Sequence, residues 1–415
     1  MKKIDVVSFV KRNRNFTFLW LSQALSQITL NMINFVMATR IYEKTGSTIA
    51  VSMLWVFIYL PAFLLGPFSG YFVDLIPLRK MLIWTNFLQG LVMLLFLFAK
   101  NSIYPIYPVV FLFSLLNQFY FPAEASALVW LVPKQDLPLA NSLFMLTSQS
   151  SLIAGLGVSG ILMRLFGKDN PIYLSSAGLF LAALAVYFLP KTQLLRKKGA
   201  DTISKFFKEI KFGYSFIVNH RLVLFPIILQ TFFQAFVVVL AVTIPGFASQ
   251  LLNIEVADAG PLLIVPLGFG ALTGIYLMAR FFHNLRKKKL MRMGFFVCLL
   301  VFIIFWSILP LLGAYKSPVS TVLMYFLGIG GFFIFIPNQT LIQEHTPLML
   351  RGRVFGALGF IITLVTLPLL LFSATIVDTI GVRFFMLFPA IFMFMLLLFL
   401  DKAEEFIIKE KNGTL

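Results

Sequence analysis

The sequence has little of what a metal centre, a disulfide framework or a catalytic cluster requires. Its 415 residues include one cysteine, three histidines and 16 acidic residues. The single cysteine, Cys298, excludes a disulfide within the chain and a cysteine-based metal site. None of the histidines, His220, His283 and His345, has the spacing of a metal-ligand pair or an Asp four residues later. We therefore predict no enzymatic activity, no metal and no cofactor.

Charge is scarce as well, and what there is has mostly one sign. Only 12% of the residues are charged, and 34 basic residues outweigh the acids to give a net charge of +18. Apolar residues are abundant: 60% of the chain is hydrophobic, 49 residues are Phe, and the mean hydropathy is +0.93. Soluble domains contain roughly 45–50% apolar and about 25% charged residues. This excess of apolar surface indicates a membrane protein.

Twelve apolar stretches reach the length of about 20 residues that a helix needs to cross a bilayer. Turn and charge signals separate them, and the longest hydrophilic segment, residues 196–215, leaves six stretches on either side. The predicted spans are 16–39, 48–73, 81–99, 105–131, 141–165, 170–190, 222–249, 259–282, 292–314, 318–341, 354–377 and 382–400.

The basic residues predict the topology. They form short runs between spans instead of one stripe, which indicates orientation signals and argues against nucleic-acid binding. With the N-terminus inside, 27 of the 34 Lys and Arg residues fall on the cytoplasmic side and 7 outside. We predict a multi-pass protein of the bacterial inner membrane, both termini cytoplasmic, with residues 1–16 retained as a helix on the membrane surface. We expect a monomer.

An internal repeat joins the two sets of six spans. Residues 117–142 return in altered form 214 positions later, so that Pro133 matches Pro347, Gly167 matches Gly381 and Arg164 matches Asp378. Repeated bundles in transporters form the substrate site where the halves meet. We predict an all-α membrane protein with twelve transmembrane helices in two pseudo-symmetric six-helix bundles. The predicted parts are residues 1–190, a cytoplasmic linker 191–220, and residues 221–415.

The segment after the second span carries a family signature. Gly70-x-x-x-Asp74 followed by Arg79-Lys80 resembles the loop 2–3 motif of the major facilitator superfamily, although Leu75 departs from the pattern. In that family, the Asp, the basic residues and the start of helix 11 form a charge relay that switches conformation. The resemblance therefore implies a relay with these members: Gly70, Asp74, Arg79, Lys80, Arg351 and Arg353.

Two further segments narrow the resemblance. Phe121 to Ser142, taken with Arg351-Gly352-Arg353-Val354-Phe355, is similar to the macrolide-efflux and enterobactin-exporter branch of drug:proton antiporters. That likeness implies drug resistance by proton-coupled efflux of an amphipathic or hydrophobic small molecule, through alternating access. Transport of a siderophore or a lysophospholipid is the alternative, and a non-transporting membrane sensor or scaffold is a third reading.

Glu124 lies within the fourth predicted span, where an ionisable side chain is a functional hypothesis by default. It is the candidate for proton coupling. It could also pair with a cationic substrate, reach cytoplasmic water, or pair with a neighbouring Lys. Its counterpart in the repeat, Asn338, is neutral, so any coupling differs between the halves.

Amide side chains share one face of the first predicted span, at positions i, i+4, i+8 and i+11, and recur in the seventh. Such stripes face either a cavity or another helix. The first span contains no acidic residue, so we do not expect it to carry protons. The candidates for the substrate cavity are Gln23, Gln27, Asn31, Asn34, Asn117, Gln230, Gln234 and Asn338.

Overall fold

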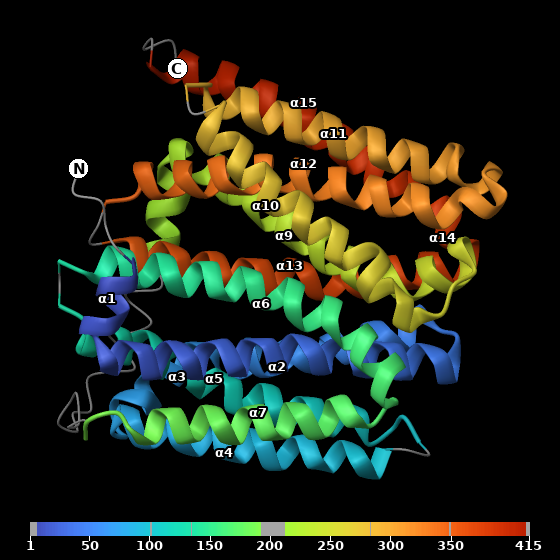
Figure 1. The fold of residues 1–415 in the computed structure, drawn as a ribbon. Helices are drawn as coiled ribbons and strands as arrows, with labels where there is room; N and C mark the ends of the chain where they lie inside the picture. The colour runs from blue at the N-terminus through green and yellow to red at the C-terminus, as the bar shows by residue number, and fades with distance from the viewer. Residues whose placement is uncertain are drawn as a thin grey trace. The chain divides into compact units, whose positions relative to one another are not determined.

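The protein is described by a computed structural model, which covers residues 6–99, 102–133, 135–191, 212–282, 284–347 and 350–411. Throughout these ranges the regular structure is helical, with no β-strand (Figure 1). The first six predicted spans correspond to α2 (Arg14–Thr45), α3 (Thr48–Asp74), α4 (Leu78–Leu95), α5 (Ile106–Leu131), α6 (Leu137–Phe166) and α7 (Asn170–Tyr187). The others correspond to α9 (Arg221–Gly246), α10 (Val265–Arg280), α11 (Lys287–Ser307), α12 (Lys316–His345), α13 (Arg351–Ile380), and α14 (Val382–Phe385) with α15 (Leu387–Lys411).

Eleven segments of the described chain are long and apolar enough to cross a membrane, which confirms the predicted fold class. The remaining predicted span, α2, forms one continuous helix of 32 residues. At 1.5 Å per residue it is about 48 Å long, more than the roughly 30 Å of a hydrocarbon core. The helix is therefore long enough to cross a membrane, but its amide side chains lower its mean hydropathy below that of the eleven apolar segments.

The chain divides into two compact units. One contains Met1–Lys44 and Met53–Thr202, and the other contains Thr45–Ser52 and Ile203–Leu415. The first turn of α3 therefore groups with the second unit. Most of the predicted linker, residues 192–211, lies outside the described residues.

The internal repeat extends to the ends of individual helices. Both α6 and α13 have 30 residues, and both ends of the second lie 214 positions after those of the first. The residue before each helix has nearly the same backbone: Asp136 has φ −96° and ψ −9°, and Leu350 has φ −102° and ψ −10°. Pro133 and Pro347, the matching prolines of the repeat, explain this similar backbone. Each proline carbonyl accepts a hydrogen bond from the amide three residues later, at 2.9 Å.

The two helices also end in the same way. Gly167 and Gly381 have φ values of +88° and +85°, in a region that L side chains rarely adopt. Their amides donate to the carbonyls of Met163 and Val377, each at 3.0 Å. The glycines thus stop the helices by a conformation that another residue would adopt only under strain.

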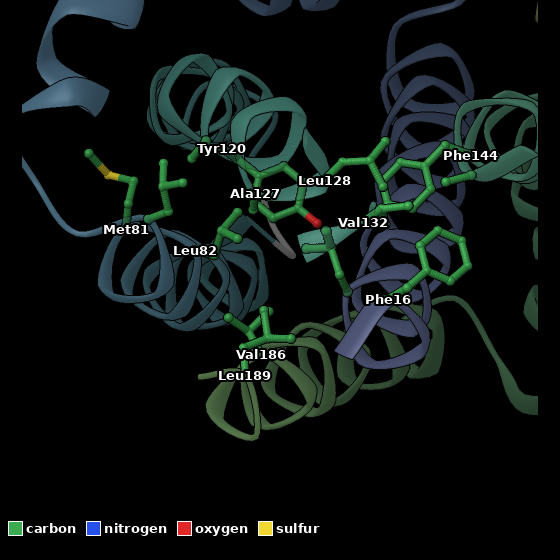
Figure 2. Close-up of a cluster of buried hydrophobic side chains, with 14 of the residues drawn as sticks. Phe16, Met81, Leu82, Tyr120, Ala127, Leu128, Val132, Phe144, Val186 and Leu189 are labelled. Atoms are coloured by element: carbon green, nitrogen blue, oxygen red, sulfur yellow. The ribbon is translucent and has the colours of Figure 1, made fainter. Parts of the chain in front are cut away.

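In the first unit, α2, α4, α5, α6 and α7 contribute to one apolar cluster (Figure 2). Tyr120 lies among these side chains with 1% of its surface exposed, beside residues such as Leu82 and Leu128. The second unit has a comparable cluster where the helix at residues 212–219 meets α9, α12 and α13. These clusters fix the positions of the polar side chains described below.

Glycines allow several helices to approach closely. A Cβ added to Gly155 of α6 would lie 2.5 Å from Cβ of Asn31 in α2 and 2.8 Å from the carbonyl oxygen of Ile28. A Cβ added to Gly270 of α10 would overlap the carbonyl of Tyr325 in α12. Small residues at such positions are how membrane helices obtain close van der Waals contact.

Candidate functional site

The carboxyl group of Glu124 is buried in the first unit. Its residue is 5% exposed and lies on α5, one turn after Tyr120. The Tyr120 hydroxyl donates a hydrogen bond to Oε1 of Glu124, at 2.8 Å. Across the described part of the chain, no Lys, Arg or His forms an ion pair with this carboxyl group. The carboxyl group is therefore held by a neutral donor, and a pair with a neighbouring Lys, one of the alternatives for Glu124, is not seen among the described residues.

Serine and asparagine residues extend this contact to two neighbouring helices. Ser26 of α2 donates its hydroxyl to the Tyr120 oxygen at 3.1 Å, and it also contacts two carbonyls of its own helix. Asn86 of α4 donates to the Ser22 hydroxyl, at 3.1 Å. Four of these side chains, Ser22, Ser26, Asn86 and Tyr120, are buried. A polar chain thus crosses α4, α2 and α5 and ends at Glu124.

The second unit has an uncharged counterpart at the matching helices. Asn338 of α12 donates through Nδ2 to Oε1 of Gln230 in α9, at 2.8 Å, and to the carbonyl of Pro226, at 3.0 Å. Asn338 is 1% exposed and Gln230 is 4% exposed. Asn338, which lies 214 positions after Glu124, therefore bonds to an amide of another helix, whereas Glu124 bonds to a phenol of its own helix.

The other amide candidates are distributed over different contacts. Gln23 donates to the carbonyl of Phe144 in α6 at 3.1 Å, and Asn31 donates to the carbonyl of Gln27 within α2 at 2.9 Å. Asn117 accepts from Gln89 at 3.5 Å. Gln27 and Asn34 are buried, and Gln234 is half-buried. At Gln23 and Gln230 the structure thus shows contact with another helix, one of the two arrangements that the stripe predicted.

The predicted relay is described only in part. The side chains of Gly70 and Asp74 lie outside the described residues, although α3 ends at Asp74. Arg79 donates to the carbonyl of Tyr187 at the end of α7, and its guanidinium lies 5.0 Å from the centre of the Tyr187 ring. Lys80 is exposed. Cations are favourable at helix C-termini, so Arg79 stabilises the end of α7 in this arrangement.

The two arginines of the second unit make similar contacts. Arg351 donates to the carbonyls of Gln343, at 2.9 Å, and Thr346, at 3.3 Å, at the end of α12. The guanidinium of Arg353 lies 5.7 Å from the ring centre of Phe212. Both residues therefore join α13 to its neighbours.

Sequence reasoning did not identify Tyr120, Ser22 or Asn86 as part of the site. For Tyr120 a signal existed, because it precedes Glu124 by four residues and such pairs lie side by side on a helix. For Ser22 and Asn86 there was none, since only the packing of α2 against α4 joins them.

Known proteins agree with this architecture. The profile of the Major Facilitator Superfamily matches residues 19–367. The chain is 24% identical to Macrolide efflux protein A of Streptococcus pyogenes over 89% of this chain and 90% of that one. It is 23% identical to the uncharacterised MFS-type transporter YfiS of Bacillus subtilis over 82% and 81% of the two chains. A shorter match, 25% identical over 37% of this chain and 40% of the other, is to the putative bacilysin exporter BacE of Bacillus subtilis.

Solved structures show the same fold. The nucleoside transporter NupG has a TM-score of 0.75 at 11% identity and is covered over 99% of its chain, with 94% of this one. A bacterial homologue of the human lysosomal transporter Spinster has a TM-score of 0.74 at 14% identity, covering 98% of that chain and 96% of this one. With its multi-pass helical fold and this profile match, the chain belongs to the Major Facilitator Superfamily, a family of membrane transporters and not of enzymes.

Proposed function

We propose that this transporter exports an amphipathic or hydrophobic small molecule in exchange for protons, and that Glu124 carries the proton. The direction rests on the relatives named for macrolide efflux and bacilysin export. The proton site rests on one observation, the buried carboxyl group of Glu124 bonded to the Tyr120 hydroxyl.

The chemistry of that carboxyl group favours a proton cycle. An ionised side chain in the middle of a span costs about 2.5–3.5 kcal/mol on insertion scales, and no cation of the described chain offsets the charge of Glu124. A protonated carboxyl group can stay buried, whereas an ionised one is stable only with water or a cation beside it. Glu124 thus binds a proton while occluded and releases it when one side of the membrane opens to it.

The other predicted features of the chain act in the same transport cycle. Residues 1–190 and 221–415 move as two bundles, and amide side chains of α2, α5, α9 and α12 contact the substrate. Asp74 with Arg79, Lys80, Arg351 and Arg353 switches the two states. The protein works as a monomer in the bacterial inner membrane. Both termini are cytoplasmic, an orientation that the 27 to 7 distribution of basic residues supports.

Transport into proteoliposomes or everted vesicles under an imposed pH gradient tests the proton site. Glu124→Gln should reduce gradient-driven transport of a macrolide to background while the protein remains folded. Glu344→Gln is the matched control, because that carboxylate is 53% exposed and pairs with Lys287. Wild-type transport by the Glu124 variant would refute the assignment. Siderophore and lysophospholipid uptake in the same vesicles tests the alternative substrates.

A further inference from the structure

The first turn of α3 is held by a residue from the far end of the sequence. Within the second unit, the carboxylate of Asp378, in the last turn of α13, accepts three hydrogen bonds. They come from the Ser47 hydroxyl at 2.6 Å, the Thr48 amide at 2.8 Å and the Ile49 amide at 3.0 Å. The partners lie about 330 positions apart in the chain.

These bonds complete the N-terminus of α3. A helix begins with four amides that have no partner inside the helix. In α3 these amides belong to Ser47, Thr48, Ile49 and Ala50. Asp378 accepts from Thr48 and Ile49, the Thr45 hydroxyl accepts from Ser47 at 3.2 Å, and the Ser47 hydroxyl accepts from Ala50 at 3.3 Å. Helix N-termini normally receive such bonds from a residue of their own chain segment. Here two of the four depend on another span.

The charge of Asp378 does not stabilise α13, the helix that contains it. A negative charge near the C-terminus of its own helix is unfavourable, whereas the same charge at the N-terminus of α3 is favourable. The repeat supports this, because the position 214 residues earlier in α6 holds a cation, Arg164, which cannot accept bonds from amides. The π-helical turn Gly260–Ile264 that leads into α10, in the described second unit, has no side-chain cap. The contact is therefore specific to α3 and α13 and is not required by the shared fold.

The contact lies in a part of α3 that does not group with the rest of the helix. Thr45–Ser52 groups with the unit that contains α13, whereas the rest of α3 from Met53 onward groups with the other unit. When the two units move relative to each other, either α3 bends near its first turn or the bonds to Asp378 break. Losing a helix N-cap typically costs about 1 kcal/mol in total, so this contact is weak enough to break within a transport cycle.

We propose that Asp378 and the first turn of α3, Ser47 to Ile49, form a latch that stabilises one of the transport states and opens in the other. The topology of basic residues puts this latch on the non-cytoplasmic side, opposite the loop that contains Asp74. The latch relies on alternating access but not on proton coupling through Glu124.

The test measures the distance between α3 and α13 by double electron–electron resonance in the full-length transporter. Spin labels at Met53 and Ile380, which are 37% and 48% exposed, are introduced after Cys298→Ser removes the native cysteine. In Asp378→Ala, the ratio of the longer to the shorter distance should rise about fivefold, the effect of losing one helix N-cap. Thr379→Ala is the control, because among the described residues its exposed hydroxyl donates to the carbonyls of Thr375 and Ile376, within α13 itself.

A second variant separates a latch from a simple helix cap. Ser47→Asp supplies α3 with a strong N-cap of its own but places a second negative charge against Asp378. A latch predicts that this variant lengthens the distance as Asp378→Ala does. A wild-type distribution in Ser47→Asp, or an unchanged ratio in Asp378→Ala, would overturn the proposal. In a labelled protein that also carries Glu124→Gln, Asp378→Ala should change the distance ratio as it does in the wild type. The test of the latch is therefore independent of the test of the proton site.

Discussion

Replacing Tyr120 by Phe is the most direct test of the polar chain that ends at Glu124. The substitution keeps the ring in its cluster, where Tyr120 is 1% exposed, and removes only the hydroxyl group. Two hydrogen bonds disappear, one to Glu124 at 2.8 Å and one from Ser26 at 3.1 Å. Ser26 keeps its contacts with the carbonyls of Ser22 and Gln23, so its loss is small. Most of the lost stability therefore comes from the hydrogen bond to Glu124.

The free energy of the hydrogen bond between Tyr120 and Glu124 depends on whether Glu124 is ionised. A hydrogen bond to a charged group contributes about 1.5–3 kcal/mol, whereas neutral side-chain bonds inside membranes average about 0.6 kcal/mol. A double-mutant cycle of Tyr120→Phe and Glu124→Leu, which leaves no acceptor at position 124, isolates this coupling energy from the rest of the fold. We expect a coupling near 0.6 kcal/mol where Glu124 is protonated, and one above 1.5 kcal/mol at a pH high enough to ionise it.

Reversible unfolding in mixed detergent micelles, repeated at several pH values, gives the four free energies of the cycle. The Ser26→Ala variant is the control, since it removes the other hydrogen bond of Tyr120 and should show little change with pH. A coupling energy indistinguishable from zero at every pH would refute the contact between Tyr120 and Glu124. A coupling energy that does not change with pH would refute the titration of Glu124 over that range.

Two predictions concern the glycines. Gly381→Ala should lower the unfolding free energy by about 1–2 kcal/mol, because its φ of +85° is strained for an L residue, whereas Gly356→Ala has open space and should be neutral or stabilising in the same thermal assay. Gly270→Val should force α10 away from α12 and lower the melting temperature much more than Gly359→Val, which meets no atom within 4 Å. Equal losses of stability for Gly381→Ala and Gly356→Ala would contradict the strained backbone at Gly381. Equal losses for Gly270→Val and Gly359→Val would contradict the close contact of α10 with α12.

Helix ends were the most predictable part of the fold. Pro133 and Pro347 correctly mark the turns before α6 and α13, and Gly167 and Gly381 correctly mark their ends, because these residues restrict the backbone locally. The first span was also predicted from its length, although its amide side chains leave it outside the eleven apolar segments.

The contacts of the candidate site were much less predictable. The sequence makes Glu124 a candidate because an isolated carboxyl group within a span is rare. Sequence reasoning could not find the chain through Ser22 and Asn86, and it could not pair Asp378 with Ser47, because these contacts depend on how distant helices pack. The amide stripe likewise left open which residues contact a helix, and the structure shows Gln23 doing so.

The amide pair in the second unit has an electrical consequence. Gln230 and Asn338 carry no charge where the first unit carries Glu124, so the paired positions hold one titratable group between them. Under the proposed coupling, each cycle that exports a neutral molecule brings one proton, and one positive charge, into the cell. The membrane potential would then contribute about 2.3 kcal/mol per 100 mV to export, in addition to about 1.4 kcal/mol for each unit of pH difference. Such a pump would continue to work in a medium without any pH gradient.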